Sequence, residues 1–309
     1  MSRVRTRAGP RFPAVVMRAG ARQIGRRVLD PGLPWDVQRR RLERLSGSAP
    51  LPPGTTVTEQ ERGGVRAEVV TAGTAAADRV VVHFHGGGYC VGSPRLARAW
   101  AAHLSARAGC RVVLPDYRLA PEHPHPAALD DARAVVTATL DEAGGGPVVL
   151  SGDSAGAGLA LATAATVRKR QQNALAGCIL MAPWLDLGAD RRGDPDLLRR
   201  DVLLSPGWLE ACAEAYAKRP DWADPSVSPL REDHAGLPPL LIQSGADELL
   251  APDAERMAVS ASAAGVDVTY TRWPRMWHDF ALQPGLLAAA DSALAQAAWF
   301  VEAVTAGKS

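Results

Sequence analysis

The sequence predicts an α/β protein with a mostly parallel sheet that is covered by helices on both faces. Short runs rich in Val, Ile and Leu recur along the chain, and longer alanine-rich stretches with helical spacing separate most of them. Such alternation is typical of parallel strands joined by crossover helices. A composition of 47% hydrophobic and 22% charged residues fits a soluble globular chain and excludes a mainly disordered one.

The expected strands are short and apolar, and they cover residues 65–70, 79–83, 111–114, 148–151, 178–181, 240–243 and 266–271. The clearest expected helices cover residues 95–108, 127–142, 155–170 and 252–264. Residues 187–234 break this rhythm because they are charged and contain no clear strand. We interpret them as an insertion that covers a site at the carboxyl edge of the sheet, where α/β proteins bind ligands.

A turn-rich segment, residues 46–54, separates the first 45 residues from the strands. We therefore expect an N-terminal helical cap segment at 1–45 and a main domain at 46–309 that carries a cap insertion around 187–234. The first acidic residue is Asp30, and eight arginines precede it. We interpret this stretch as a solvated arm leading into a surface helix; a transit peptide and an anchor to an anionic surface remain as alternatives.

Charge and hydropathy limit the partners of the chain. Thirty-five basic and 33 acidic residues give a net charge of +2, which is too balanced for a dedicated nucleic-acid binder. No apolar stretch is long enough for an export signal or a membrane span, so we expect a cytoplasmic protein without stable membrane insertion.

The four cysteines are widely spaced and are expected to be reduced, mostly buried thiols. We expect no metal site, because the pairs His83/His85 and His123/His125 have no carboxylate or thiolate at ligand spacing.

A candidate nucleophile lies in Gly152-Asp-Ser-Ala-Gly156, which joins the strand at 148–151 to a helix of small residues. This strand–turn–helix pattern is a nucleophile elbow, in which the glycines relieve crowding and Ser154 is exposed at the helix start. The amide of Ala155 and the positive end of the helix can then face a developing oxyanion. The run His85-Gly-Gly-Gly88 follows another strand, and we expect Gly87 and Gly88 to supply further oxyanion amides.

A serine nucleophile needs a base and a group that orients the base. His278 follows the last expected strand, and Asp247 follows the strand at 240–243. We predict that they are the base and the acid. Glu248 is adjacent, but consecutive residues point apart, so Glu248 and Asp247 cannot both reach the imidazole.

Other acids and histidines are weaker candidates. Asp186 is the nearest rival acid because it also follows a strand. Asp153 is expected to serve the hydrogen bonds of the elbow, and Asp279 to face solvent or to be structural. His234 lies in a polar loop and is not expected to act as a base.

These residues together resemble the hormone-sensitive-lipase-like esterases of the α/β-hydrolase fold. The resemblance covers roughly residues 55–305 and includes the order Ser, Asp, His and the segment Asp116-Tyr-Arg-Leu-Ala-Pro-Glu-His-Pro124. It implies an eight-stranded sheet, a cap built from both helical segments, and hydrolysis of short-to-medium-chain carboxylic esters without a cofactor. It also implies a possible homodimer through the last strand. Ala157 and Asp279 stand where the family frequently has glycine, and Asp279 adds negative charge beside the base.

The expected activity is that of a serine carboxylesterase acting on a small-molecule ester. An amidase, a lactonase or a deacetylase would use the same triad, since the pocket discriminates the leaving group. A receptor that binds a small molecule without turnover is the alternative of another class, although such receptors typically lack the histidine. Tyr89, Trp184, Trp208 and Trp277 are candidates for apolar pocket walls.

Overall fold

The computed structural model describes residues 11–47, 49–73, 79–170, 174–191 and 193–306. Its centre is a sheet in the order β1-β2-β4-β3-β5-β6-β7-β8. The strands are β1 (Thr56–Arg62), β2 (Val65–Thr71), β3 (Val80–Phe84), β4 (Arg111–Pro115), β5 (Val148–Asp153), β6 (Leu175–Met181), β7 (Leu240–Gly245) and β8 (Val268–Trp273). Strand β2 pairs antiparallel with both β1 and β4, and the remaining pairs are parallel. The predicted mostly parallel, eight-stranded α/β-hydrolase sheet is confirmed.

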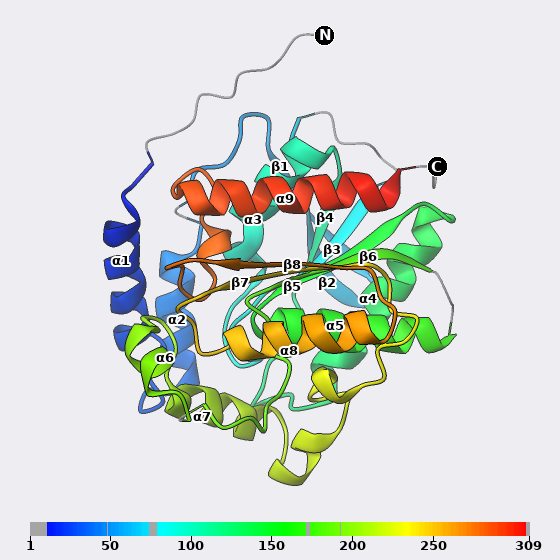
Figure 1. Cartoon of the computed structure of the whole chain (residues 1–309). Helices are drawn as coiled ribbons and strands as arrows, with labels where there is room; N and C mark the ends of the chain where they lie inside the picture. The colour runs from blue at the N-terminus through cyan, green and yellow to red at the C-terminus, as the bar shows by residue number, and fades with distance from the viewer. Residues whose placement is uncertain (1–10, 48, 74–78, 171–173, 192, 307–309) are drawn as a thin grey trace.

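Helices cover both faces of the sheet (Figure 1). One face carries α3 (Pro94–Ala108) and α9 (Ala288–Thr305), and the other carries α4 (Ala127–Ala143), α5 (Ala155–Arg170) and α8 (Ala251–Ala263). Strands β3, β5, β6 and β7 are buried along their whole length because helices lie on both sides. Helix α3 begins with Pro94 and ends at Gly109, whose positive φ closes the last turn.

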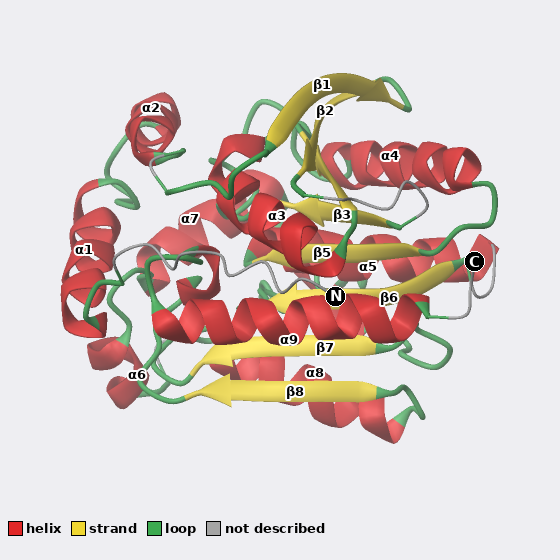
Figure 2. Cartoon of the chain, turned by 90° about the horizontal axis from the view of Figure 1, so that it is seen from above, coloured by secondary structure: helices red, strands yellow, loops and turns green. Residues whose placement is uncertain are grey.

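A further group of helices lies beyond the carboxyl ends of the parallel strands (Figure 2). We call it the helical layer; it consists of α1 (Ala14–Arg27), α2 (Trp35–Leu45), α6 (Pro195–Arg200) and α7 (Pro206–Tyr216). The short 3₁₀ segments η1 (Arg219–Ala223) and η2 (Pro229–Arg231) complete the connection from β6 to β7, and η3 (Phe280–Leu282) follows β8. The residues at 187–234 therefore lie between two strands, and the described part of this range contains no strand of its own.

The two halves of the helical layer are tied together by a buried hydrogen bond. The indole nitrogen of Trp208 donates to Gln38 Oε1 at 2.9 Å, and neither residue is more than 2% exposed. Gln38 also donates to the carbonyls of Asp30 and Leu33. Buried polar groups of this kind are costly unless they are paired, so the bond fixes α2 against α7.

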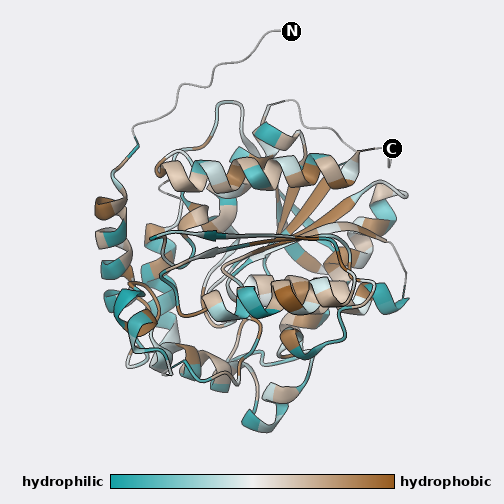
Figure 3. Ribbon diagram, in the orientation of Figure 1, coloured by the Kyte–Doolittle hydropathy of each residue, from teal (hydrophilic) through white to brown (hydrophobic). Residues whose placement is uncertain are grey.

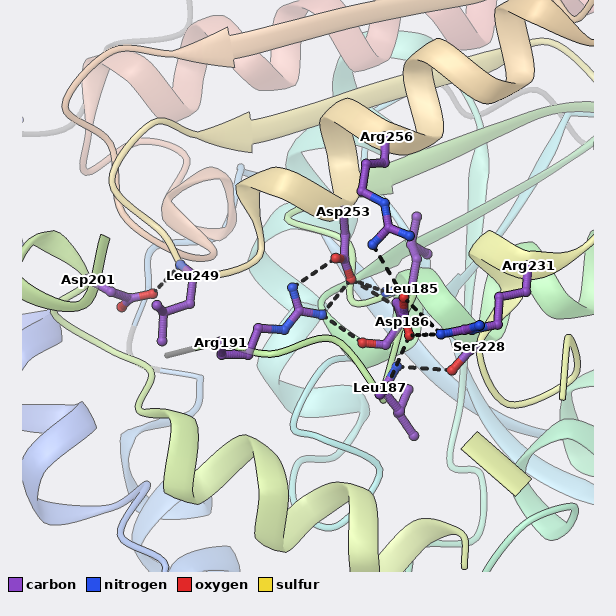
Figure 4. A network of polar contacts seen from close by, with 11 residues as sticks. Leu185, Asp186, Leu187, Arg191, Asp201, Ser228, Arg231, Leu249, Asp253 and Arg256 are labelled. Carbon is purple, nitrogen blue, oxygen red and sulfur yellow. Dashed lines mark hydrogen bonds and ion pairs between the residues drawn. The ribbon is translucent and has the colours of Figure 1, made fainter. Parts of the chain in front are cut away.

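The connection after β6 is held by a buried acidic residue of α8 (Figure 4). Asp253 is fully buried, and its carboxylate accepts hydrogen bonds from the amides of Leu185 and Asp186 and forms an ion pair with Arg191 at 2.8 Å. Further along, Asp201 accepts a hydrogen bond from the amide of Leu249 at 2.7 Å. The segment from β6 to α6 is thereby fixed to the loop that follows β7.

One prediction is confirmed, and one strand was not predicted. All four cysteines are buried and unpaired, as predicted. Strand β1 was not expected from local sequence, because its residues are polar and mostly exposed. None of the helices in the described ranges combines the length and the hydropathy needed to cross a bilayer.

Candidate active site

Ser154 lies in the sharp turn between β5 and α5. Its φ is +53°, a left-handed conformation that non-glycine residues rarely adopt. Its amide donates to Met181 O at 2.9 Å, which fixes the turn against β6. A Cβ at Gly152 would overlap the backbone of Gly156, and a Cβ at Gly156 would overlap the carbonyl of Phe84. The elbow geometry therefore depends on both glycines of the motif.

His278 lies beside Ser154 in the loop after β8. Its Nε2 atom is 3.0 Å from Ser154 Oγ, and the two residues are 2% and 3% exposed. The structure thus brings together the predicted nucleophile and the predicted base. The base loop is also tied to the loop after β7, since the amide of Asp247 donates to Met276 O at 2.9 Å.

Glu248, and not Asp247, is the acidic residue at the other ring nitrogen. Glu248 is fully buried, and its Oε2 atom lies 3.3 Å from His278 Nδ1. The carboxylate of Asp247 points to the helical layer, where Arg18 Nη1 lies at 2.9 Å and Arg200 Nη1 at 3.5 Å. The prediction that Asp247 orients the imidazole is therefore corrected. The side chains of Asp247 and Glu248 point apart, as expected, but Glu248 is the one that faces the imidazole.

Residues distant in the sequence determine where the side chains of Asp247 and Glu248 point. Arg18 of α1 binds Asp247 and the carbonyls of Arg275 and Arg200, so it draws the Asp247 side chain outward. Asp201 holds the amide of Leu249, directly after Glu248. Neither Arg18 nor Asp201 carries a local sequence signal that would identify this role.

A second carboxylate contacts the base. Asp279 Oδ2 lies 3.2 Å from His278 Nε2, the same ring nitrogen that faces Ser154. Asp279 has a φ of +57°. Its Oδ1 atom is buried and has no hydrogen-bond partner among the described residues. Of the two expected positions for Asp279, facing solvent or structural, the structure favours the second, with its carboxylate in contact with the base.

The two carboxylates change the proton affinity of the site. Burial opposes a charge on His278, but Asp279 and Glu248 outweigh it and raise the pKa of the imidazole well above its usual value. Burial raises the pKa of Glu248 to about 7, and the imidazole opposes this shift. Burial also raises the pKa of Asp279. The three groups form one coupled set in which an imidazolium is strongly favoured.

The glycine loop after β3 packs against the elbow. A Cβ at Gly86 would lie 3.1 Å from Ser154 Cβ, so the loop and the nucleophile are in contact. Gly87 and Gly88 have φ values of +118° and +63°, which glycine adopts without strain. Their amides and that of Ala155 have no acceptor within the described part of the chain. These three donors are thus available to an oxyanion.

Asp153 connects the elbow to this loop. Its Oδ2 atom accepts from the amide of Gly86 at 2.9 Å, and its Oδ1 atom lies 3.1 Å from His83 Nε2. His83 Nδ1 in turn contacts Ser151 Oγ at 3.1 Å. The predicted role of Asp153 in local hydrogen bonding holds, but its link to the glycine loop was not foreseen.

The remaining candidates lie outside this cluster. Asp186 is buried and pairs with Arg231 and Arg256 (Figure 4). His234 is buried and contacts Pro229 O at 3.4 Å.

The other histidines contact neighbouring side chains, and the aromatic candidates are buried. His85 stacks on Tyr117 with ring centroids 4.4 Å apart, and His125 contacts Ser226 Oγ. All four predicted wall residues are buried, namely Tyr89, Trp184, Trp208 and Trp277.

Comparison with known proteins agrees with this geometry. The family described as having the alpha/beta hydrolase fold matches residues 81–282, which is more than half of the chain. An acetyl-hydrolase of Streptomyces hygroscopicus is 37% identical over 246 residues, covering 79% of this chain and 81% of that protein. An esterase of Acinetobacter venetianus is 36% identical over 264 residues, covering 84% and 86%. A crystal structure of a hormone-sensitive lipase from a metagenome library superimposes with a TM-score of 0.89 at 31% identity, covering 96% and 99%.

The chain belongs to the hormone-sensitive-lipase-like carboxylesterases of the alpha/beta hydrolase fold. Because the chain belongs to these carboxylesterases, its substrates are small-molecule esters. Two carboxylates contact the base of this carboxylesterase, Glu248 at Nδ1 and Asp279 at Nε2. Their placement depends on the loops after β7 and β8, which local sequence patterns do not resolve.

Proposed function

We propose that this carboxylesterase hydrolyses short-to-medium-chain carboxylic esters through an acyl-enzyme on Ser154. The observation that carries the proposal is the 3.0 Å contact between Ser154 Oγ and His278 Nε2, with a buried carboxylate at the opposite ring nitrogen. Nucleophile, base and orienting acid in this order are what acyl transfer requires.

In the first half-reaction, Ser154 Oγ attacks the ester carbonyl carbon while its proton passes to His278 Nε2. The carbonyl oxygen gains negative charge, which the amides of Gly87, Gly88 and Ala155 stabilise. The C–O bond to the alcohol then breaks, and the imidazolium returns its proton to the leaving oxygen. The products of this step are an alcohol and an acyl ester of Ser154.

In the second half-reaction, water takes the place of the alcohol. His278 accepts a proton from water as the hydroxyl oxygen attacks the acyl carbon, and the same amides hold the oxyanion. The bond to Ser154 Oγ breaks and the serine recovers its proton. The free acid is released and the enzyme returns to its starting state.

We assign the orienting role to Glu248 in place of Asp247. A carboxylate at Nδ1 fixes the ring tautomer that leaves Nε2 free to accept the serine proton, and it stabilises the imidazolium. Glu248 is suitably located for this, with Oε2 at 3.3 Å. Asp247 has the supporting role of linking the loop to Arg18 of α1.

We propose that the helical layer is the cap of the site and that it opens for substrate. The low exposure of Ser154, 3%, supports a cap that moves to admit substrate. A Cβ at Gly88 would meet Cys212 Sγ at 2.5 Å and Trp208 at 3.0 Å, so α7 lies directly over the oxyanion loop. Large aromatic residues at this position favour a narrow acyl pocket and therefore short acyl chains.

Two further properties complete the proposal. Strand β8 lies at one edge of the sheet, and this free edge supports a homodimer formed through the last strand. Four buried, unpaired cysteines favour a reducing compartment such as the cytoplasm.

The test is hydrolysis of p-nitrophenyl esters from acetate to palmitate by the wild-type enzyme and by Ser154→Ala. We expect turnover with the short esters and a loss of about 10⁴-fold or more in kcat for the variant. Turnover that survives in Ser154→Ala would contradict the assignment of the nucleophile. A folded wild-type enzyme inactive on the whole series would overturn the ester proposal in favour of amides, lactones or binding without turnover.

A further inference from the structure

The exposed side of α1 begins with apolar side chains. Phe12, just before the helix, is 45% exposed, Val15 is 73% exposed and Val16 is 53% exposed. They fall within five consecutive positions, whereas the other large exposed apolar residues in the described ranges are dispersed along the chain. The start of α1 is coloured as hydrophobic in Figure 3. Leaving such side chains in water is unfavourable, so a cluster of them marks an interaction surface.

The same side of α1 ends with basic side chains. Arg22, Arg26 and Arg27 are exposed, and none of them has an acidic partner within the described part of the chain. At 100° per residue, these arginines and the apolar residues project from one half of the helix. Arg18 lies one turn before Arg22, at the edge of this half of the helix, and is engaged with Asp247.

A groove runs beside the basic end of α1. Its volume is about 580 Å³. Arg22, Arg26 and Arg199 line it together with Leu29, Leu198 and Leu203. Arg22 and Arg26 have no acidic partner within the described ranges, whereas Arg199 pairs with Asp196, and Asp30 and Asp201 also line the groove. The groove therefore places two unpaired guanidinium groups next to apolar side chains.

We propose that this side of α1 is a docking surface for a bilayer containing acidic phospholipids. The apolar residues would insert at the boundary between head groups and acyl chains, and the arginines would pair with lipid phosphates. The charge distribution supports this partner, because the first acidic residue of the chain is Asp30. A nucleic acid would satisfy the arginines but would leave Phe12, Val15 and Val16 exposed to water.

The location of α1 gives the docking a consequence for the enzyme. Arg18, one turn before Arg22, binds Asp247 next to Glu248. A bilayer bound to the outer side would therefore lie against the cap, where it could deliver apolar esters. The proposal itself concerns binding and does not depend on which ester the enzyme cleaves.

The experiment is co-sedimentation of the full-length protein with vesicles of phosphatidylcholine alone or mixed with phosphatidylglycerol. We expect binding to the mixed vesicles only, weakened by added salt. The pair Arg22→Glu and Arg26→Glu should reduce the affinity by about tenfold or more. The matched control is Arg107→Glu with Arg170→Glu, which changes the net charge equally at exposed positions away from α1 and should bind better than the α1 variant.

A second variant tests the apolar part. Val15→Ser with Val16→Ser keeps every charge and should also weaken binding to the mixed vesicles. Hydrolysis of a soluble short ester verifies that each variant is folded, because none of these residues belongs to the active site. Equal binding by the α1 and control arginine variants, full binding by the serine variant, or binding to duplex DNA but not to vesicles would each overturn the proposal.

Discussion

Asp279 and Ser154 contact the same nitrogen of His278, with Asp279 Oδ2 at 3.2 Å and Ser154 Oγ at 3.0 Å. Only one of them can share the proton of that nitrogen at full strength. When the imidazole is charged, the ion pair with Asp279 is favoured, and the ring cannot accept the serine proton. The neutral ring is free to act as a base, so the contact makes activity sensitive to pH.

Replacing Asp279 should shift the pH dependence of the enzyme. Asp279 raises the pKa of His278, and the base is active only when deprotonated, so activity should increase as pH rises through that pKa. Asp279→Gly removes one cause of the raised pKa and should move the acidic limb of kcat/KM to lower pH. The measurement is a pH profile with a short ester. Asp267→Asn, an exposed aspartate outside the site, is the control, and an unshifted profile for Asp279→Gly would refute the competition.

Exchanging the two neighbouring acids should identify the orienting group. Glu248→Gln keeps the size of the side chain but removes the charge at Nδ1, and we expect kcat to fall by about 10²- to 10⁴-fold. Asp247→Asn should retain most of kcat, since its carboxylate faces Arg18. Steady-state kinetics of the two variants decide the matter, and the reverse order of effects would return the role to Asp247.

Removing the carboxylate of Asp153 should weaken the oxyanion site without touching the triad. Asp153→Ala leaves the amide of Gly86 and the ring of His83 without their acceptor, so the glycine loop loses its anchor. We expect kcat to decrease by about tenfold to 10²-fold, because small displacements of positioned groups are costly in catalysis. Asp153→Asn retains an acceptor oxygen and should be much less affected. Wild-type kcat in the alanine variant would rule out this linkage.

The buried ion pair between Arg191 and Asp253 should contribute strongly to stability. Arg191→Met leaves the carboxylate of Asp253 buried without its cation, and we expect the free energy of unfolding to fall by about 3–5 kcal/mol. Arg66→Met breaks an exposed pair with Asp116 and should have little effect on the free energy of unfolding. Urea denaturation of both variants provides the comparison, and similar losses would contradict the role of burial.

Much of the fold and part of the site could be predicted from local sequence. The elbow is recognisable because Ser154 needs glycines on both sides and a strand before it, and these are all neighbours in the chain. The apolar strands were recognisable by their hydrophobic residues. Strand β1 was missed because it is polar and exposed, and its existence depends on pairing with β2 along the register Thr56↔Thr71.

The choice between Asp247 and Glu248 could not be made from sequence. Both follow β7, and their side chains point apart, so the answer depends on which way the loop turns. That turn depends on Arg18 and Asp201, which are 229 positions from Asp247 and 48 positions from Leu249 respectively. The contact of Asp279 with the base was not predicted for a similar reason, since it depends on the conformation of the loop after β8, where Asp279 has a φ of +57°.

The hydrogen bond from Trp208 to Gln38 joins two cap segments that are separated by 170 positions. Because the bond is buried, α2 and α7 should move together as one rigid body rather than independently. Cap exchange between related enzymes would then transfer substrate preference only when both segments come from the same parent. A chimera with mismatched halves would carry an unpaired amide or indole in its interior, and its α2 and α7 would be less firmly fixed to each other.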